Sequence, residues 1–64
     1  MGNGKLVWHG MSEADAFNAV VGSGRYEYIA SGNSWFWVRY KKDPSDVIEV
    51  RSENGVVVDV DFVG

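Results

Sequence analysis

Over most of the second half of the chain, hydrophobic and polar residues alternate one by one, which is the pattern of half-buried β-strands. Four such runs predict strands at about 25–30, 35–41, 47–51 and 56–63. Turn-forming residues separate the runs, and the clearest of them is Glu53-Asn54-Gly55, because an Asn-Gly pair favours a tight hairpin turn. The order of the runs predicts an antiparallel meander.

The first third of the chain follows a helical period instead. Ser12 is a good N-cap, with carboxylates in the first turn where they favour the positive end of the helix dipole. A glycine-rich stop follows at residues 22–24, so a helix is expected from about Ser12 to Val21. Leu6–Trp8 is short and apolar, and it is either a short first strand or a segment covering the end of the core. Residues 1–4 are expected to be flexible.

A consistent choice of faces follows from this alternation, since successive strand side chains point to opposite sides. One face of the predicted sheet collects apolar residues from all four strands, and the apolar stripe of the helix can pack against it. The fold class is therefore α+β, a single domain over 1–64 with one helix on a four-stranded antiparallel meander. The expected helix stripe is Ala14, Phe17, Val20 and Val21; the expected sheet core is Tyr26, Tyr28, Phe36, Val38, Tyr40, Ile48, Val50, Val56, Val58, Val60 and Phe62.

The strand at 35–41 places large side chains on both of its faces. If Phe36 and its neighbours face the core, the other face carries Trp35, Trp37, Arg39 and Lys41. Aromatic side chains beside cations are typical of protein interface anchors, and they can also stack single-stranded bases. A third interpretation is that the tryptophans are covered by another segment or only stiffen the sheet.

The distribution of charge bears on that choice. The 64 residues carry a net charge of −3, with six acids against one base in 43–64 and three acids against five bases in 1–42. This polarity favours a protein partner or a second copy over generic phosphate binding. A purely structural interpretation, in which the charges form solvated cross-strand pairs, stays open.

Chemistry beyond binding is not indicated. The chain has no cysteine, and its one histidine, His9, makes a poor metal site without other soft ligands. No serine has an evident His-acid relay, and no complete cofactor loop is present. We therefore expect no enzyme activity, no cofactor and no bound metal. The first residues lead into only three apolar ones, Leu6–Trp8, so no signal peptide or membrane span is predicted and a cytoplasmic location is expected.

One further pattern concerns the helix and the hairpin. The segment from Gly10-Met11-Ser12 to Val21-Gly22, followed by Trp35-Phe36-Trp37 and Asn54-Gly55-Val56-Val57, resembles the SmpA/OmlA (BamE-like) lipoprotein domain. It is also similar to the repeated unit of β-lactamase inhibitor proteins. The lipid-attachment cysteine and second helix of that family have no counterpart here. The resemblance implies a helix-on-sheet module whose relatives bind proteins without catalysis, and it transfers no specific binding residue.

The sequence thus predicts a small non-enzymatic protein-binding module, a regulator or inhibitor of the kind found among phage or bacterial accessory proteins. Trp35 and Trp37 are the expected anchors, with Arg39 and Lys41 orienting the partner. The alternatives are a single-stranded nucleic-acid-binding protein that uses the same four residues, and a homo-oligomeric structural protein that pairs through an edge strand.

Overall fold

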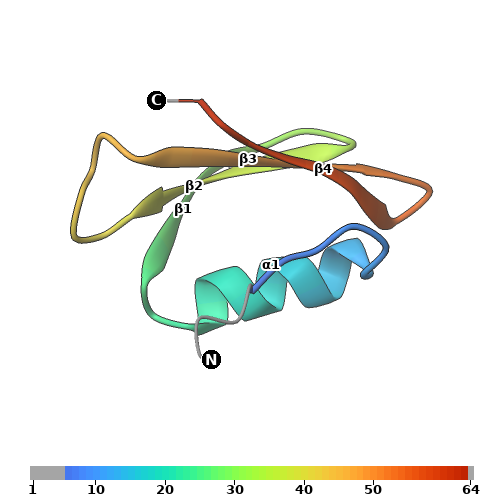
Figure 1. The fold of residues 1–64 in the computed structure, drawn as a ribbon, viewed down its shortest axis with the longest axis horizontal. Helices are drawn as coiled ribbons and strands as arrows, with labels where there is room; N and C mark the ends of the chain where they lie inside the picture. Colours follow the sequence, from blue (N-terminus) through green and yellow to red (C-terminus); the bar gives the residue numbers. More distant parts are fainter. Residues whose placement is uncertain (1–5, 64) are drawn as a thin grey trace.

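The protein is built from two layers, a single helix beneath an open sheet (Figure 1). The computed structural model describes residues 6–63, so the flexibility expected for residues 1–4 lies outside the described part of the chain. The elements are α1 (Glu13–Gly22), β1 (Tyr26–Ser31), β2 (Trp35–Tyr40), β3 (Val47–Glu53) and β4 (Val56–Phe62). All neighbouring strands are antiparallel, in the order β1-β2-β3-β4, which confirms the predicted α+β meander.

Helix α1 begins one residue later than expected, because Ser12 is its N-cap. The Ser12 side chain accepts a hydrogen bond from the Asp15 backbone N–H at 3.0 Å, which satisfies a donor that the helix itself leaves free. The buried face of the helix is centred on Ala16 and Val20. Ala14 is exposed, contrary to the predicted stripe, because the helix is turned about its own axis so that Ala16 faces the sheet instead.

The turn between β3 and β4 has the predicted hairpin geometry. Asn54 and Gly55 both have positive φ, 54° and 78°, as a two-residue turn matching the twist of the strands requires. Asparagine and glycine are the residues that adopt this conformation at least cost. This turn fixes where β4 starts relative to β3.

Two bulges change the faces that simple alternation predicts. In β1 the extra residue is Ile29, opposite β2. In β4 the extra residue is Val58, opposite β3, where the pairing passes from Arg51–Asp59 to Ser52–Val57. As a result Val57 is buried while Val56 and Val58 are exposed, so the predicted placement of Val56 and Val58 in the core is wrong. A bulge places two residues of one strand opposite one of its partner, which shifts the face of everything beyond it.

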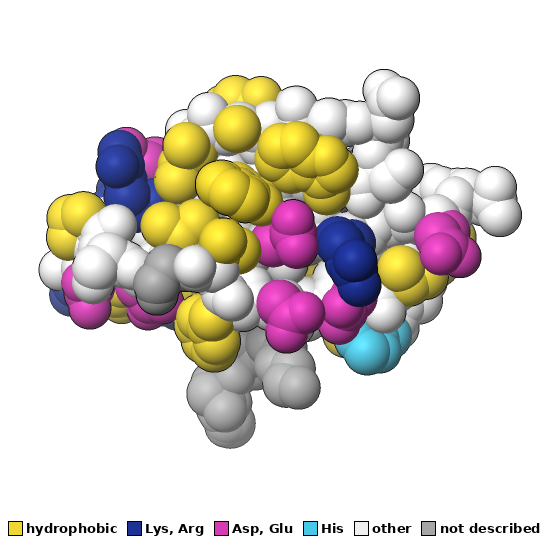
Figure 2. Space-filling model, turned by 90° about the horizontal axis from the view of Figure 1, so that it is seen from above, with side chains coloured by type: hydrophobic (Ala, Val, Ile, Leu, Met, Phe, Trp, Pro, Cys, Tyr) yellow, Lys and Arg dark blue, Asp and Glu magenta, His cyan; other side chains and the backbone are white. Residues whose placement is uncertain are grey.

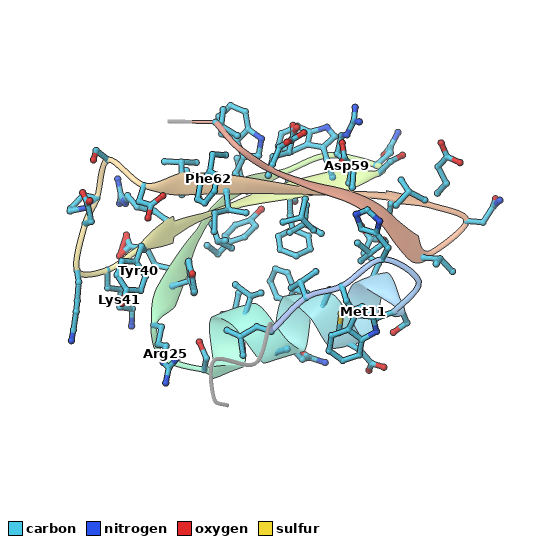
Figure 3. The ribbon with its side chains drawn as sticks, in the orientation of Figure 1. Met11, Arg25, Tyr40, Lys41, Asp59 and Phe62 are labelled. Atoms are coloured by element: carbon cyan, nitrogen blue, oxygen red, sulfur yellow. The ribbon has the colours of Figure 1, made fainter. Side chains whose placement is uncertain are left out.

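The core lies between α1 and the middle of the sheet. It consists of Met11, Ala16, Val20, Phe36, Val38, Val50 and Val57. Leu6 and Val7 pack against this core without forming a strand, which selects the covering-segment interpretation of Leu6–Trp8. Figure 3 shows Met11 at the start of α1, on the segment that leads into the helix.

The helix covers only part of the sheet. Beyond its end, the core-side residues of β4 become exposed: Val60 lies opposite the buried Val50, yet it is 36% exposed, and Phe62 is 75% exposed. A single helix of ten residues is too narrow to cover four strands. Within residues 6–63, no helix has the length and apolar character needed to cross a membrane.

Candidate functional site

The face of the sheet opposite α1, hereafter the outer face, has no second layer over it among residues 6–63 (Figures 1 and 2). Register places twelve side chains there, because residues paired across strands share a face. They are Glu27, Ala30, Trp35, Trp37, Arg39, Val47, Glu49, Arg51, Glu53, Val56, Asp59 and Asp61. Figure 2 shows an apolar patch on this face directly beside acidic side chains.

The two tryptophans of β2 lie together on the outer face, as the sequence predicted. Their ring centroids are 5.6 Å apart with planes inclined at 52°. Both are half-buried, and the Trp37 Nε1–H donates to Glu49 Oε2 across the strand pair at 3.0 Å. A large apolar ring with its polar atom satisfied at one edge is the type of side chain that protein interfaces use.

Trp35 is held from its other side by the β1–β2 hairpin loop. A β-carbon built on Gly32 would lie 2.3 Å from Trp35 Nε1 and 2.6 Å from Cε2, so the indole rests directly on the glycine. The Gly32 backbone N–H also donates to Trp35 O at 2.9 Å, which closes the loop. The absence of a side chain at Gly32 therefore decides where this indole lies.

The cations of the outer face are already paired. Arg39 Nη2 donates to Glu27 Oε2 at 2.6 Å, and Arg51 Nη2 donates to Asp59 Oδ2 at 2.8 Å. These hydrogen bonds and the accompanying charge attraction hold the pKa of Glu27 and of Asp59 below their usual values. Both pairs are partly solvated, so each contributes little to folding stability.

The fourth predicted residue, Lys41, is not on a strand. Strand β2 ends at Tyr40, and Lys41 lies in the following turn, where its backbone N–H donates to Arg25 O at 2.9 Å. It is exposed, and in Figure 3 it lies near Tyr40 at the end of the sheet where Arg25 also lies. The structure therefore brings Trp35, Trp37 and Arg39 together along β2 and leaves Lys41 just beyond the strand.

A second feature escaped the sequence prediction altogether. On the helix side of the sheet, beside the C-terminal end of α1, a cavity of about 510 Å³ lies among Leu6, Val7, Val20, Tyr26, Ile48 and Val60, with Arg25 and Asp46 also in its lining. Its apolar residues come from separate parts of the chain, and the alternation pattern had assigned several of them simply to a filled core. The only feature of the sequence that indicated this cavity was that one short helix must cover four strands.

Among residues 6–63, no group of three or more histidine, aspartate or glutamate side chains is arranged to hold a metal ion. His9 contributes to the wall of the cavity instead. Comparison with known proteins finds no match to any family model, curated protein or solved structure, so the resemblance to the BamE-like domain stays a prediction.

Proposed function

We propose that this chain is a non-enzymatic module that binds another protein through its outer face. The observation that carries the proposal is the Trp35–Trp37 pair on a sheet face with no covering layer among the described residues. Half-buried aromatic rings fixed by their neighbours lose little conformational freedom on binding, which is why such rings serve as anchors. In this proposal the two indoles are the anchors.

The charges beside the indoles support a protein partner over nucleic acid. The twelve outer-face residues include five carboxylates and two guanidinium groups, which leaves a charge balance of −3. Both arginines are paired with carboxylates, and Glu49 lies against Trp37. A phosphate backbone would have to break these pairs and approach the remaining acids, whereas a basic or mixed protein surface would not.

Arg39 has a positioning role in this proposal. It lies on the same face as Trp37, one pleat further along β2, and a partner carboxylate could compete with Glu27 for its guanidinium. Lys41 extends the positive charge past the end of the strand. A small regulator or inhibitor is the class of protein that such a compact binding surface suits.

The test is capture of partners from a cell lysate on the tagged chain, with and without nuclease. The variant Trp35→Ala/Trp37→Ala is compared with Trp8→Ala, which removes an exposed tryptophan from the segment before α1. Circular dichroism first establishes that both variants are folded. A protein retained after nuclease by the wild type and Trp8→Ala, but lost by the double variant, supports the proposal.

Two results would contradict it. Retention that disappears with nuclease would favour single-stranded nucleic acid, for which tryptophan quenching by an oligonucleotide should weaken steeply with salt. A partner that the folded double variant still retains in full would show that the outer-face indoles are not the anchors. A concentration-dependent mass, measured by sedimentation, would identify the homo-oligomeric alternative.

A further inference from the structure

Strand β4 leaves part of its outward edge without a neighbouring strand among residues 6–63. The segment before α1 pairs only with its beginning: Gly10 N–H donates to Val57 O at 2.8 Å, and Val57 N–H donates to Met11 O at 2.9 Å. At the other end of the strand, Val63 N–H donates inward to Val47 O at 2.8 Å. Because backbone groups alternate along a strand, those of Val60 and Phe62 point away from β3.

One of these outward donors is occupied by a side chain. The Val60 N–H donates to Asp59 Oδ1 at 3.0 Å, while Asp59 Oδ2 accepts from Arg51. Charged side chains on an edge strand are one way in which proteins protect the edge from indiscriminate pairing. The edge is therefore available to a strand that can replace this contact.

The two sides of the edge differ sharply in chemistry. On the helix side, the apolar side chain of Val60 borders the cavity together with Leu6 and Val7, and Phe62 is largely exposed. On the outer face, Asp59 and Asp61 lie on the same strand two residues apart, as Figure 3 indicates for Asp59. A strand added here would set its alternate side chains against an apolar surface and against carboxylates.

We propose that the free edge of β4 binds an extended segment of a partner protein in which basic and apolar residues alternate. Main-chain hydrogen bonds from Val60 and Phe62 would supply binding, and the two unlike sides would supply selectivity, as in other cases of strand addition. The partner carbonyl replaces Asp59 Oδ1 as acceptor for the Val60 N–H. A basic side chain of the partner then faces Asp61.

A second copy of this chain is a poor occupant of the same edge. Antiparallel pairing of two β4 strands that continues the sheet keeps the outer faces of both copies on one side. The Asp59 and Asp61 carboxylates of both copies would then gather on that side, and like charges across a strand pair are destabilising. The inference goes beyond the outer-face proposal, because β4 and the tryptophan-bearing β2 are separated by β3 and offer different surfaces.

The probe is an end-blocked six-residue peptide of alternating lysine and valine, titrated into the 64-residue chain and followed by amide NMR. We expect saturable shifts centred on Val60 and Phe62, together with slower exchange of their amide protons. Methylating the peptide nitrogens that face β4 should weaken binding at least about ten-fold, since two backbone hydrogen bonds are lost. Replacing the lysines by glutamates should abolish it.

Matched variants test the charge contribution. Asp61→Asn should weaken peptide binding about two- to five-fold, the effect of one cross-strand charge pair. Glu53→Gln removes one exposed charge near the other end of the same hairpin and should change the affinity less than two-fold, within the usual scatter for a distant surface charge.

Each of four results with the peptide or the free chain would overturn the inference: no shifts at millimolar peptide, binding that survives N-methylation, protection of the Phe62 amide already present in the free monomer, or a dimer with that protection. Shifts centred on Trp35 and Trp37 would also overturn it, while leaving the outer-face proposal intact. Conversely, edge binding by the peptide would stand even if the lysate experiment contradicted the role of the tryptophans.

Discussion

Substituting Gly32 by alanine tests whether Trp35 is an ordered part of the binding surface. The backbone at Gly32 is not in the left-handed region, so alanine itself introduces no backbone strain. The new methyl group, however, would overlap the Trp35 indole, whose nearest atoms lie 2.3 and 2.6 Å away. The substitution therefore moves the indole, the loop or both.

Two opposing effects set the magnitude. Replacing glycine by alanine reduces the entropy of the unfolded chain and stabilises the fold by about 0.4–1 kcal/mol. Overpacking a held side chain costs about 1–3 kcal/mol, and displacing the indole also weakens its contact with Trp37, worth about 0.5–1.5 kcal/mol. We expect a net loss of about 2 kcal/mol, within a range of about 0.5–4 kcal/mol, in the free energy of unfolding.

The second arm of the experiment removes the obstacle. In a Trp35→Ala background the methyl group meets no indole, so Gly32→Ala should stabilise the fold by about 0.4–1 kcal/mol. The two backgrounds should then differ by about 3 kcal/mol, within a range of about 1.5–4.5 kcal/mol, in the effect of the same substitution. This coupling is well above the scatter for independent sites.

Urea unfolding followed by far-ultraviolet circular dichroism measures all four proteins without relying on tryptophan emission. An unchanged dependence on urea concentration shows that the denatured states are comparable. If Gly32→Ala stabilises the wild type as much as it stabilises Trp35→Ala, the indole is not held over the loop. The Trp35–Trp37 pair would then not be a preformed anchor, and the outer-face proposal would lose its main support.

Two further predictions concern the second bulge and the first ion pair. Val57→Ala should cost about 2–3 kcal/mol of unfolding free energy because it empties a buried site, whereas the exposed Val58→Ala should stay within about 0.5 kcal/mol; equal or reversed losses in urea unfolding would contradict the bulge at Val58. The pKa of Glu27 lies below its ordinary value of 4.5 because of the bond from Arg39, so the stabilisation from this pair is complete above that value and is lost as the pH falls through the lowered pKa. Carbon NMR titration should show Arg39→Gln raising the Glu27 pKa toward 4.5, and an unchanged pKa would mean that the pair does not form in solution.

Local signals in the sequence were enough for the elements themselves. Ser12 and the following carboxylates set the start of α1, and Asn54-Gly55 set the hairpin, because both depend on hydrogen bonds and dihedral preferences within a few residues. In β2 the apolar Phe36 and Val38 alternate with Trp35 and Trp37. The pattern correctly predicted that Phe36 and Val38 are buried.

Tertiary structure decided the faces of β4. The run Val56-Val57-Val58 contains no polar residue, so alternation alone cannot tell which valine points inward. In a regular strand Val57 and Asp59 would share a face, because they are two residues apart. The bulge at Val58 allows Val57 to enter the core while Asp59 contacts Arg51 on the outer face. The backbone pairing of Val57 with Gly10 and Met11 fixes this choice from a distant part of the chain.

The features of the candidate sites can also be divided into those that the sequence determined and those that the tertiary structure decided. The sequence by itself determined that Trp35, Trp37 and Arg39 share one face, because that follows from the two-residue period of a single strand. Only the tertiary structure decided that Arg39 is bound to Glu27, that Lys41 lies past the end of β2, and that the edge of β4 borders a cavity on the helix side. These features depend on register between strands and on how far one short helix reaches across the sheet, and both are set by packing between segments distant in sequence.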